Sequence, residues 1–207
     1  MEEIQSFPAK RAIVNPYFSI LIPSWNNLPY LTLCINSIRK HSQVPFELIV
    51  HLNESEDGSK EWVEAQGDIA YSLSEKNVGV CHAMNAMRTL ANANYLLYLN
   101  DDMYVLPGWD VELKNEIELC GTQKFFFSST MIEPRAQSLC SIEADFGNSI
   151  ENFQEEKLIN AYLPFKFQDW QGSTWPPNVV HKDLWDLVGG YSVEFSPGMY
   201  SDPDFSM

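Results

Sequence analysis

Polar and aromatic side chains follow three apolar segments of the sequence, at the points where those segments end. The first segment ends in Pro23-Ser24-Trp25-Asn26, the second in Asn53-Glu54-Ser55 and the third in Asn100-Asp101-Asp102. Two adjacent carboxylates beside an amide are unfavourable unless a cation lies between them, and Mg²⁺ or Mn²⁺ prefers carboxylate, water and phosphate oxygens. The same residue types are also common in turns and helix caps. Asp101 and Asp102 are therefore candidates for a divalent metal site, with an ordinary turn as the alternative.

The elements that must position these residues alternate between two hydrophobic patterns. Short apolar runs, typical of buried strands, occupy residues 17–23, 46–52, 69–73 and 95–100. Helical spacing of apolar residues, or a capping signal at Asp57 and Ser59, predicts helices at 28–41, 59–66 and 79–93. This alternation predicts an α/β layer with mainly parallel strands. Because ligands bind at the carboxyl ends of such strands, we expect the three strand ends to meet at one edge of the sheet.

The second half of the chain is less regular. We expect a helix near 108–119, a strand at 124–132 and a helix around 150–161, followed by the aromatic, Pro-rich stretch FKFQDWQGSTWPP. These patterns divide the chain into a loose leader (1–16), a nucleotide-binding α/β half (17–105) and an acceptor half built onto it (106–207).

The composition excludes several classes of protein. With 28 acidic and 13 basic residues, the formal net charge is −15, which disfavours a duplex-binding surface or a polybasic membrane patch, so we expect neither nucleic-acid nor membrane partners. A phosphorylated ligand would need a divalent cation to help neutralise it.

The four cysteines, which lack any C-x-x-C pair, fit neither a zinc cage nor a disulfide scaffold. No apolar run approaches the roughly 18 residues of a membrane span, and the acidic start lacks a signal-peptide core, so we expect a soluble, cytoplasmic chain.

Four segments together resemble the inverting glycosyltransferases of family 2, which have the GT-A fold. The segments are FSILIPSWNN, IVHLNESEDGS, EKNVGVCHAMN and YLLYLNDDM. They are similar, in this order, to the family's first strand with its Pro-Ser/Thr-aromatic-Asn end, its V-D-N-G-S-x-D-G-S/T segment, its N-x-G-x-x-x-A-x-N helix start, and the strand before its Asp-x-Asp metal motif. The resemblance covers about residues 17–207 and implies an α/β, three-layer sandwich with a mainly parallel mixed sheet.

The resemblance implies nucleotide-sugar-binding roles for residues at the first three strand ends. Pro23 and Trp25 match positions that line the nucleobase pocket, and Asn53 matches a position where the family often has an Asp that accepts the base N–H. Packing is the alternative role for Trp25. Asn77, Gly79 and Asn85 match the helix-start segment, and ordinary loop and cap chemistry is their alternative. An Asn at 53, with Leu52 in place of another frequent Asp, makes the identity of the base less certain, with uracil slightly favoured.

In the metal motif, the resemblance implies that Asp102 binds Mn²⁺ or Mg²⁺ directly and that Asp101 lies beside the sugar or ribose. Asn100 stands where the family has the first Asp of the motif.

The segment LVGGYSVEFSPGMYSDPDFSM resembles the family's G-G-F-x-x-x-F segment followed by E-D-x-D-L. In this register Asp202 falls on the catalytic base, Ser201 replaces the usual Glu, and Asp204 is the second acid. The alternative for Asp202 is a helix N-cap before Pro203. Because the following helix would be very short, we expect the chain to be a C-terminally truncated fragment.

The resulting hypothesis is a metal-dependent inverting glycosyltransferase. It would move a sugar from a nucleoside-diphosphate sugar to a hydroxyl of a glycan or other acceptor, in polysaccharide or glycoconjugate synthesis. Trp170, Trp175 and, less strongly, Asp204 would line the acceptor site. The alternative is a non-catalytic or degenerate carbohydrate-binding protein in which the two Trp rings stack on sugars. The sequence SWNNLPY after the first strand lacks the Gly-rich basic loop of a nucleotidyltransferase, and neither G-x-G-x-x-G nor a P-loop is present.

Overall fold

The computed structural model describes residues 3–136, 140–165, 169 and 176–206. Its main sheet has seven strands in the order β1-β4-β3-β2-β5-β9-β6. These strands are β1 (Ile4–Phe7), β2 (Phe18–Trp25), β3 (Phe46–Asn53), β4 (Ile69–Ser74), β5 (Tyr95–Tyr98), β6 (Phe126–Ser128) and β9 (Asn178–His181). The four central strands β4, β3, β2 and β5 run parallel, whereas β1, β9 and β6 pair antiparallel with their neighbours. A second pair, β7 (Met131–Glu133) and β8 (Ser141–Glu143), is parallel.

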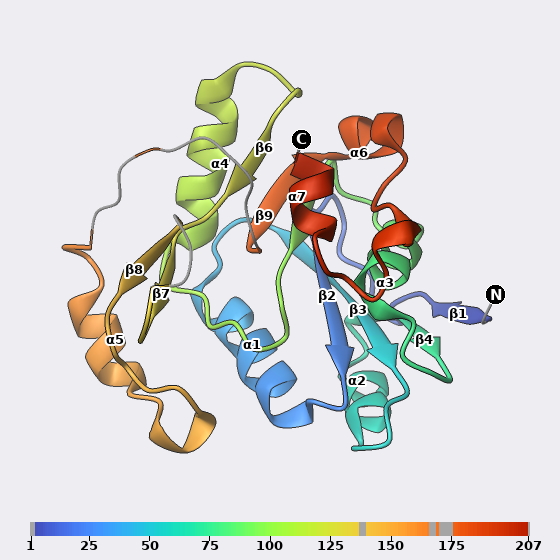
Figure 1. The fold of residues 1–207 in the computed structure, drawn as a ribbon, viewed down its shortest axis with the longest axis horizontal. Coiled ribbons are helices and arrows are strands. Elements are labelled where there is room, and N and C mark those ends of the chain that lie inside the picture. Colours follow the sequence, from blue (N-terminus) through green and yellow to red (C-terminus); the bar gives the residue numbers. More distant parts are fainter. Residues whose placement is uncertain (1–2, 137–139, 166–168, 170–175, 207) are drawn as a thin grey trace.

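Helices cover both faces of the main sheet (Figure 1). The α-helices are α1 (Leu28–His41), α2 (Ser59–Gln66), α3 (Gly79–Arg88), α4 (Trp109–Cys120), α5 (Glu155–Ala161), α6 (Lys182–Val188) and α7 (Ser201–Ser206), and the 3₁₀ turns are η1 (Ile150–Asn152) and η2 (Val193–Phe195). Alternate residues of β2 serve opposite faces, as expected for a strand buried on both sides. Ile20 and Ile22 pack in the cluster that includes α1, α2 and α4, whereas Leu21 packs in the cluster that includes α3 and α6. The predicted three-layer α/β sandwich with a mainly parallel mixed sheet is confirmed.

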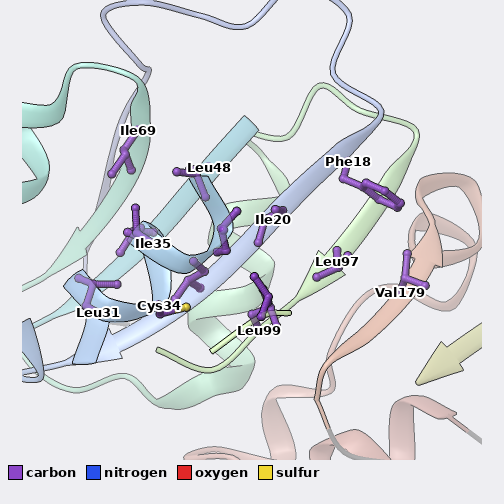
Figure 2. Packing of buried hydrophobic residues seen from close by; sticks show 14 of the residues in the cluster. Phe18, Ile20, Leu31, Cys34, Ile35, Leu48, Ile69, Leu97, Leu99 and Val179 are labelled. Carbon is purple, nitrogen blue, oxygen red and sulfur yellow. The ribbon is translucent and has the colours of Figure 1, made fainter. Parts of the chain in front are cut away.

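The packing around α1 shows why the elements in the first half of the chain could be predicted from the sequence. Leu31, Cys34 and Ile35 are fully buried and lie against the sheet residues Ile20 and Leu48 (Figure 2). The helix spans Leu28–His41, as its apolar spacing predicts, with Pro29 in its first turn, where a missing N–H costs nothing.

Four predicted elements differ from the structure. The expected loose leader contains β1, which pairs with β4 and places Phe7 on Tyr71 with ring centroids 4.6 Å apart. The helix predicted at 79–93 ends at Arg88. The strand predicted at 124–132 is divided into β6 and β7, and the helix predicted around 150–161 into η1 and α5. The division of the chain into two functional halves stays a prediction. Within the described residues, no helix combines the length and the hydropathy needed to cross a bilayer.

Candidate active site

A cleft of about 1100 Å³ opens beside the carboxyl end of β5. The loop after β5 contributes Asn100, Asp102 and Tyr104, β7 contributes Glu133, and the first turn of α7 contributes Asp202. The cleft therefore brings together Asp102 and Asp202, which lie far apart in the sequence and were both predicted to act in the reaction. Of the described residues that line it, none is Lys, Arg or His, so the cleft is acidic.

The two carboxylates after β5 have different surroundings. Ser24 Oγ donates a hydrogen bond of 2.7 Å to Asp101 Oδ2 and ties this side chain to the end of β2. Burial raises the pKa of Asp101, although hydrogen bonds from Ser24 and Asn27 partly oppose this shift. Asp102 remains solvent-accessible at the cleft, and desolvation by the surrounding protein raises its pKa as well. For both carboxylates, loss of hydration is the largest cause of the raised pKa.

This arrangement fits a divalent cation held mainly by substrate and water. Among the residues that the structure describes, no group of three or more His, Cys, Asp or Glu side chains is placed to hold a metal ion. Mg²⁺ commonly binds through one or two carboxylates and completes its octahedron with water and phosphate oxygens. Asp102, with Asp101 beside it, offers that donor set in an acidic cleft.

Asp202 lies in the first turn of α7, which begins at Ser201. The alternative prediction, an N-cap at Asp202, is therefore wrong, because the helix starts one residue earlier. Tyr191 OH donates a hydrogen bond of 2.8 Å to Asp202 Oδ1. Burial raises the pKa of Asp202 to about 6, against lowering contributions from Tyr191 and from the amide of Asn178. A carboxylate with a pKa near 6 is mostly ionised at neutral pH and is a stronger base than an ordinary Asp.

Trp25 forms the centre of a second group of residues, at the carboxyl ends of β2, β3 and β4. Its side chain is 56% exposed, and its indole Nε1 donates a 2.7 Å hydrogen bond to Glu54 Oε2. The other Glu54 oxygen accepts a longer bond, of 3.4 Å, from the backbone N–H of Asn77. Asn26, Glu54 and Ser55 all have positive φ. Non-glycine residues with this backbone geometry often mark functional sites.

Asn53 and Pro23, both predicted to line the nucleobase pocket, are buried in the structure. Asn53 is 4% exposed; its Oδ1 accepts a 2.9 Å hydrogen bond from Val78 N, and its Nδ2 donates to Ser24 O at 3.4 Å. Pro23 is buried inside β2. In the structure, Asn53 joins the end of β2 to the loop after β4. The base-binding roles of both residues stay predictions.

Two of the predicted residues of the helix-start segment, Gly79 and Asn85, contact the C-terminal part of the chain, and Asn77 caps the segment itself. Gly79 has a φ of +78°, and a Cβ built there would lie 2.4 Å from Pro197 Cα. Asn85 exchanges two hydrogen bonds with the backbone of Tyr191, at 2.8 and 2.9 Å. Asn77 Oδ1 accepts from Gly79 N at 2.9 Å. Each contact supplies a structural reason for the residue type, and nucleotide binding by these three residues stays a prediction.

Of the predicted acceptor residues, Trp170 and Trp175 lie outside the described residues. Asp204 is exposed on α7 and is not among the residues that line the cleft. Its acceptor role stays a prediction.

Sequence reasoning missed Glu54, Tyr191 and Asn178. Glu54 stands where the resembling segment V-D-N-G-S has its Gly, and Tyr191 stands where G-G-F has its Phe. These two departures were visible in the sequence, but their hydrogen-bond partners were not. Asn178 lies at the start of β9, an element that the sequence analysis did not predict.

The layered sheet, with carboxylates from two distant segments in one cleft at its strand ends, defines a protein of the GT-A fold. A model of the family "Glycosyl transferase family 2" matches residues 19–159, more than half of the chain. The chain belongs to this family. Two curated relatives from Pasteurella multocida, a chondroitin synthase (strain Pm70) and a hyaluronan synthase, are each 23% identical over 172 residues. The alignment covers 77% of this chain but only 16% of each relative.

Solved structures show the same fold. S. aureus TarS 1–349 aligns with a TM-score of 0.65 and 18% identity, over 91% of this chain and 53% of that chain. The same protein in complex with UDP-GlcNAc has a TM-score of 0.64 and 17% identity, over 91% of this chain and 52% of that chain. Mannosyltransferase PcManGT from Pyrobaculum calidifontis, in complex with GDP-Man and Mn²⁺, aligns at 0.61 and 16% identity, over 96% of this chain and 54% of that chain. This chain thus spans about half of the length of these solved chains.

Proposed function

We propose that this protein is a metal-dependent inverting glycosyltransferase that moves a sugar from a nucleoside-diphosphate sugar to an acceptor hydroxyl. The observation that carries the proposal is the meeting of Asp102 and Asp202 in one cleft, at the strand ends of a family 2 fold. The relatives are named as synthases of two polysaccharides, and the similar structures hold UDP-GlcNAc or GDP-Man. These names support a nucleotide-sugar donor and a role in polysaccharide or glycoconjugate synthesis.

The cation-binding part of the proposal assigns Mn²⁺ or Mg²⁺ to Asp102, with Asp101 beside it. A cation bound there would supply positive charge next to the diphosphate, which gains negative charge as it leaves. The described part of the cleft wall offers no Lys, Arg or His for this purpose. PcManGT, which has the same fold, is bound to Mn²⁺ together with its nucleotide sugar.

The remaining chemistry belongs to the protein side chains. Asp202 accepts the proton of the acceptor hydroxyl while the hydroxyl oxygen attacks the anomeric carbon from the side opposite the diphosphate. This single displacement inverts the configuration at that carbon. A pKa of about 6 leaves Asp202 ionised and able to take the proton at neutral pH. Trp25 offers an exposed ring on which the nucleobase stacks, and Asp101 lies on the ribose side. We also propose a cytoplasmic location, where the buried thiols of Cys34 and Cys81 stay reduced.

A thermal-shift screen of nucleoside diphosphates and their sugars, each with and without Mn²⁺, tests the donor and the metal. The proposal expects stabilisation by at least one nucleotide that requires the cation. The anomeric configuration of the product, determined by NMR, then tests inversion. Binding of a glycan without any nucleotide response would instead support the carbohydrate-binding alternative.

A further inference from the structure

The ring of Tyr191 is held on three sides. It is 2% exposed and stacks on Phe205 of α7, with ring centroids 4.7 Å apart and planes within 5°. Trp185 of α6 lies at 5.3 Å, and Tyr98 of β5 meets the ring edge at 6.2 Å. A ring fixed in this way leaves its hydroxyl little freedom, and that hydroxyl donates to Asp202 Oδ1 at 2.8 Å.

The backbone of Tyr191 is fixed as firmly as its ring. Asn85 Nδ2 donates to Tyr191 O at 2.8 Å, and Asn85 Oδ1 accepts from Tyr191 N at 2.9 Å. At the preceding residue, Gly190, a Cβ would lie 2.4 Å from Asn85 Oδ1, so only glycine lets the two segments meet this closely. Helix α3 therefore fixes the position of the Tyr191 hydroxyl relative to α7.

The polar and titratable groups around Asp202 come from four elements. Tyr98 faces it from β5, Asn178 from β9 and Cys81 from α3, while Asp204 lies on the same helix. Asn178 is 5% exposed, and its Nδ2 meets no acceptor at hydrogen-bonding geometry. The donor at strict hydrogen-bonding geometry to the Asp202 carboxylate is Tyr191 OH, at Oδ1, and the nearby amide of Asn178 also lowers the pKa of Asp202.

We propose that Tyr191 is a positioning residue for the catalytic base: its hydroxyl occupies Asp202 Oδ1 and leaves Oδ2 as the oxygen that takes the acceptor proton. The acceptor O–H bond breaks and its proton goes to Oδ2, while a bond forms between the acceptor oxygen and the anomeric carbon. The bond from that carbon to the diphosphate breaks, and its electron pair leaves with the diphosphate. This inference rests on the proposed function. It goes beyond the family resemblance, because the resembling segment has Phe at this position and the hydroxyl is an addition of this chain.

Tyr191→Phe keeps the buried ring and removes only the hydroxyl. NMR of protein labelled with ¹³Cγ-Asp gives one resonance for each Asp carboxyl, and the resonance that is missing from the Asp202→Asn spectrum belongs to Asp202. Its chemical shift as a function of pH gives the titration midpoint of Asp202. Loss of a hydrogen bond to a carboxylate should raise this midpoint by about one pH unit in Tyr191→Phe. Tyr71→Phe is the matched control, because Tyr71 OH donates to Glu64 Oε1 at the similar distance of 2.7 Å, outside the cleft. An Asp202 midpoint that is the same in wild type and Tyr191→Phe overturns the inference.

The kinetic readout is the pH dependence of kcat/KM for nucleoside diphosphate release from the donor. In Tyr191→Phe, the pH at which kcat/KM falls on the acid side should be higher than in wild type. The value of kcat/KM should be about tenfold lower well below the midpoint and near normal on the plateau above it. An equal loss at every pH would indicate a purely structural role and overturn the inference. Asp202→Asn tests the proposed function separately: if it keeps normal turnover, Asp202 is not the base, and the positioning role falls with it. If Asp202→Asn is inactive but the Tyr191→Phe profile is unchanged, only the inference fails.

A measurement on the unaltered protein covers the case in which Tyr191→Phe does not fold. The ¹³Cζ resonance of Tyr191 should show a step at the Asp202 midpoint, because ionisation of the acceptor changes the shielding of the donor ring. This step should be absent from Asp202→Asn. A Tyr191 resonance that ignores the Asp202 titration overturns the inference.

Discussion

Asp102 and Asp202 carry the same functional group in different surroundings, and the two roles that we propose for them follow from this difference. Asp102 is solvent-accessible at the cleft, and none of the described lining residues is Lys, Arg or His. These surroundings suit a carboxylate that binds a metal ion. Asp202 is half-buried at the cleft and accepts a hydrogen bond from Tyr191, and burial raises its pKa to about 6, which suits a carboxylate that exchanges a proton. The distinction leads to separate predictions for the two residues.

Asp202→Asn should stabilise the fold at neutral pH. The folded protein holds the Asp202 proton more tightly than the unfolded chain, with a pKa of about 6 against 3.8. The contribution of this carboxyl to stability is therefore fully present below pH 3.8 and is lost as the pH rises through about 6. Asn does not titrate and can still accept the Tyr191 hydrogen bond. We expect the free energy of unfolding at about pH 7.5 to rise by roughly 1–3 kcal/mol, and to change little near about pH 4. Urea denaturation at both pH values measures this, and destabilisation at the higher pH would contradict the buried placement of Asp202.

Asp102→Asn should remove the Mn²⁺ dependence of nucleotide binding without unfolding the protein. The side chain is solvent-accessible, so its replacement costs little stability. Isothermal titration with UDP and GDP, in Mn²⁺ and in chelator, measures the effect. Glu116→Gln, an exposed change of the same charge on α4, should bind like wild type. Equal binding by wild-type protein in Mn²⁺ and in chelator would show that the metal site is wrong.

Trp25→Ala should weaken nucleotide binding by about 1–3 kcal/mol, the range for one base stacked on an aromatic ring. Because the side chain is 56% exposed, the melting temperature should fall by only a few degrees. Trp25→Phe keeps a ring but loses the bond to Glu54 Oε2, so it should bind with intermediate affinity. Titration calorimetry with the nucleotide from the screen gives the three affinities. A large loss of stability with unchanged affinity would assign Trp25 to packing.

Between elements, α3 and the segment before α7 depend on a contact that only glycine allows. Gly79 and Gly189 both have positive φ, at +78° and +88°, but only Gly79 has backbone atoms of another segment in the place of a Cβ. Gly189→Ala should therefore cost about 1 kcal/mol of stability from backbone strain alone. Gly79→Ala should cost clearly more, because the Pro197 backbone must move as well. Equal losses for the two variants in chemical denaturation would contradict the close packing of α3 against residues 196–198.

The first half of the fold could be predicted because its signals are local. The apolar spacing of Leu31, Cys34 and Ile35 fixes α1, and the continuous apolar runs of β2 and β3 fix the central strands. β1 was missed because a four-residue edge strand buries too little to leave a hydrophobic pattern. β9 is buried along its whole length but was missed because four residues are too few for a recognisable pattern, so it is recognised only by its pairing with β5 and β6.

The candidate site was predictable only where a residue falls in a sequence motif with a recognisable register. Asp102 and Asp202 could be identified because they fall in motifs with a recognisable register. Tyr191 and Glu54 could not, because their importance comes from hydrogen bonds to Asp202 and Trp25 that form only after distant loops are packed together.

On the scale of the whole molecule, the net charge of −15 sets the conditions under which the protein is stable. Salt should stabilise the fold, because it screens repulsion among the acidic residues. Several described ion pairs that salt would weaken, such as Lys40–Glu155 at 2.6 Å, are exposed and contribute little. We expect the melting temperature to rise by a few degrees between about 20 and 200 mM NaCl. A falling melting temperature would mean that attractive pairs outweigh the repulsion.

The pairing of β1 with β4 also determines which borders of the main sheet are open to other molecules. Without β1, the six residues of β4 would present a row of unpaired backbone N–H and C=O groups, which is the template on which strands of other chains add. Phe7 covers Tyr71 on the same side, so its loss would also leave an aromatic surface uncovered. A chain shortened to start at Tyr17 would keep the cleft and every residue proposed for catalysis, yet would be prone to self-association through β4. Because β1 is itself the edge strand but has only four residues, it leaves a shorter row of unpaired backbone groups than β4 would, and so lowers the tendency to aggregate.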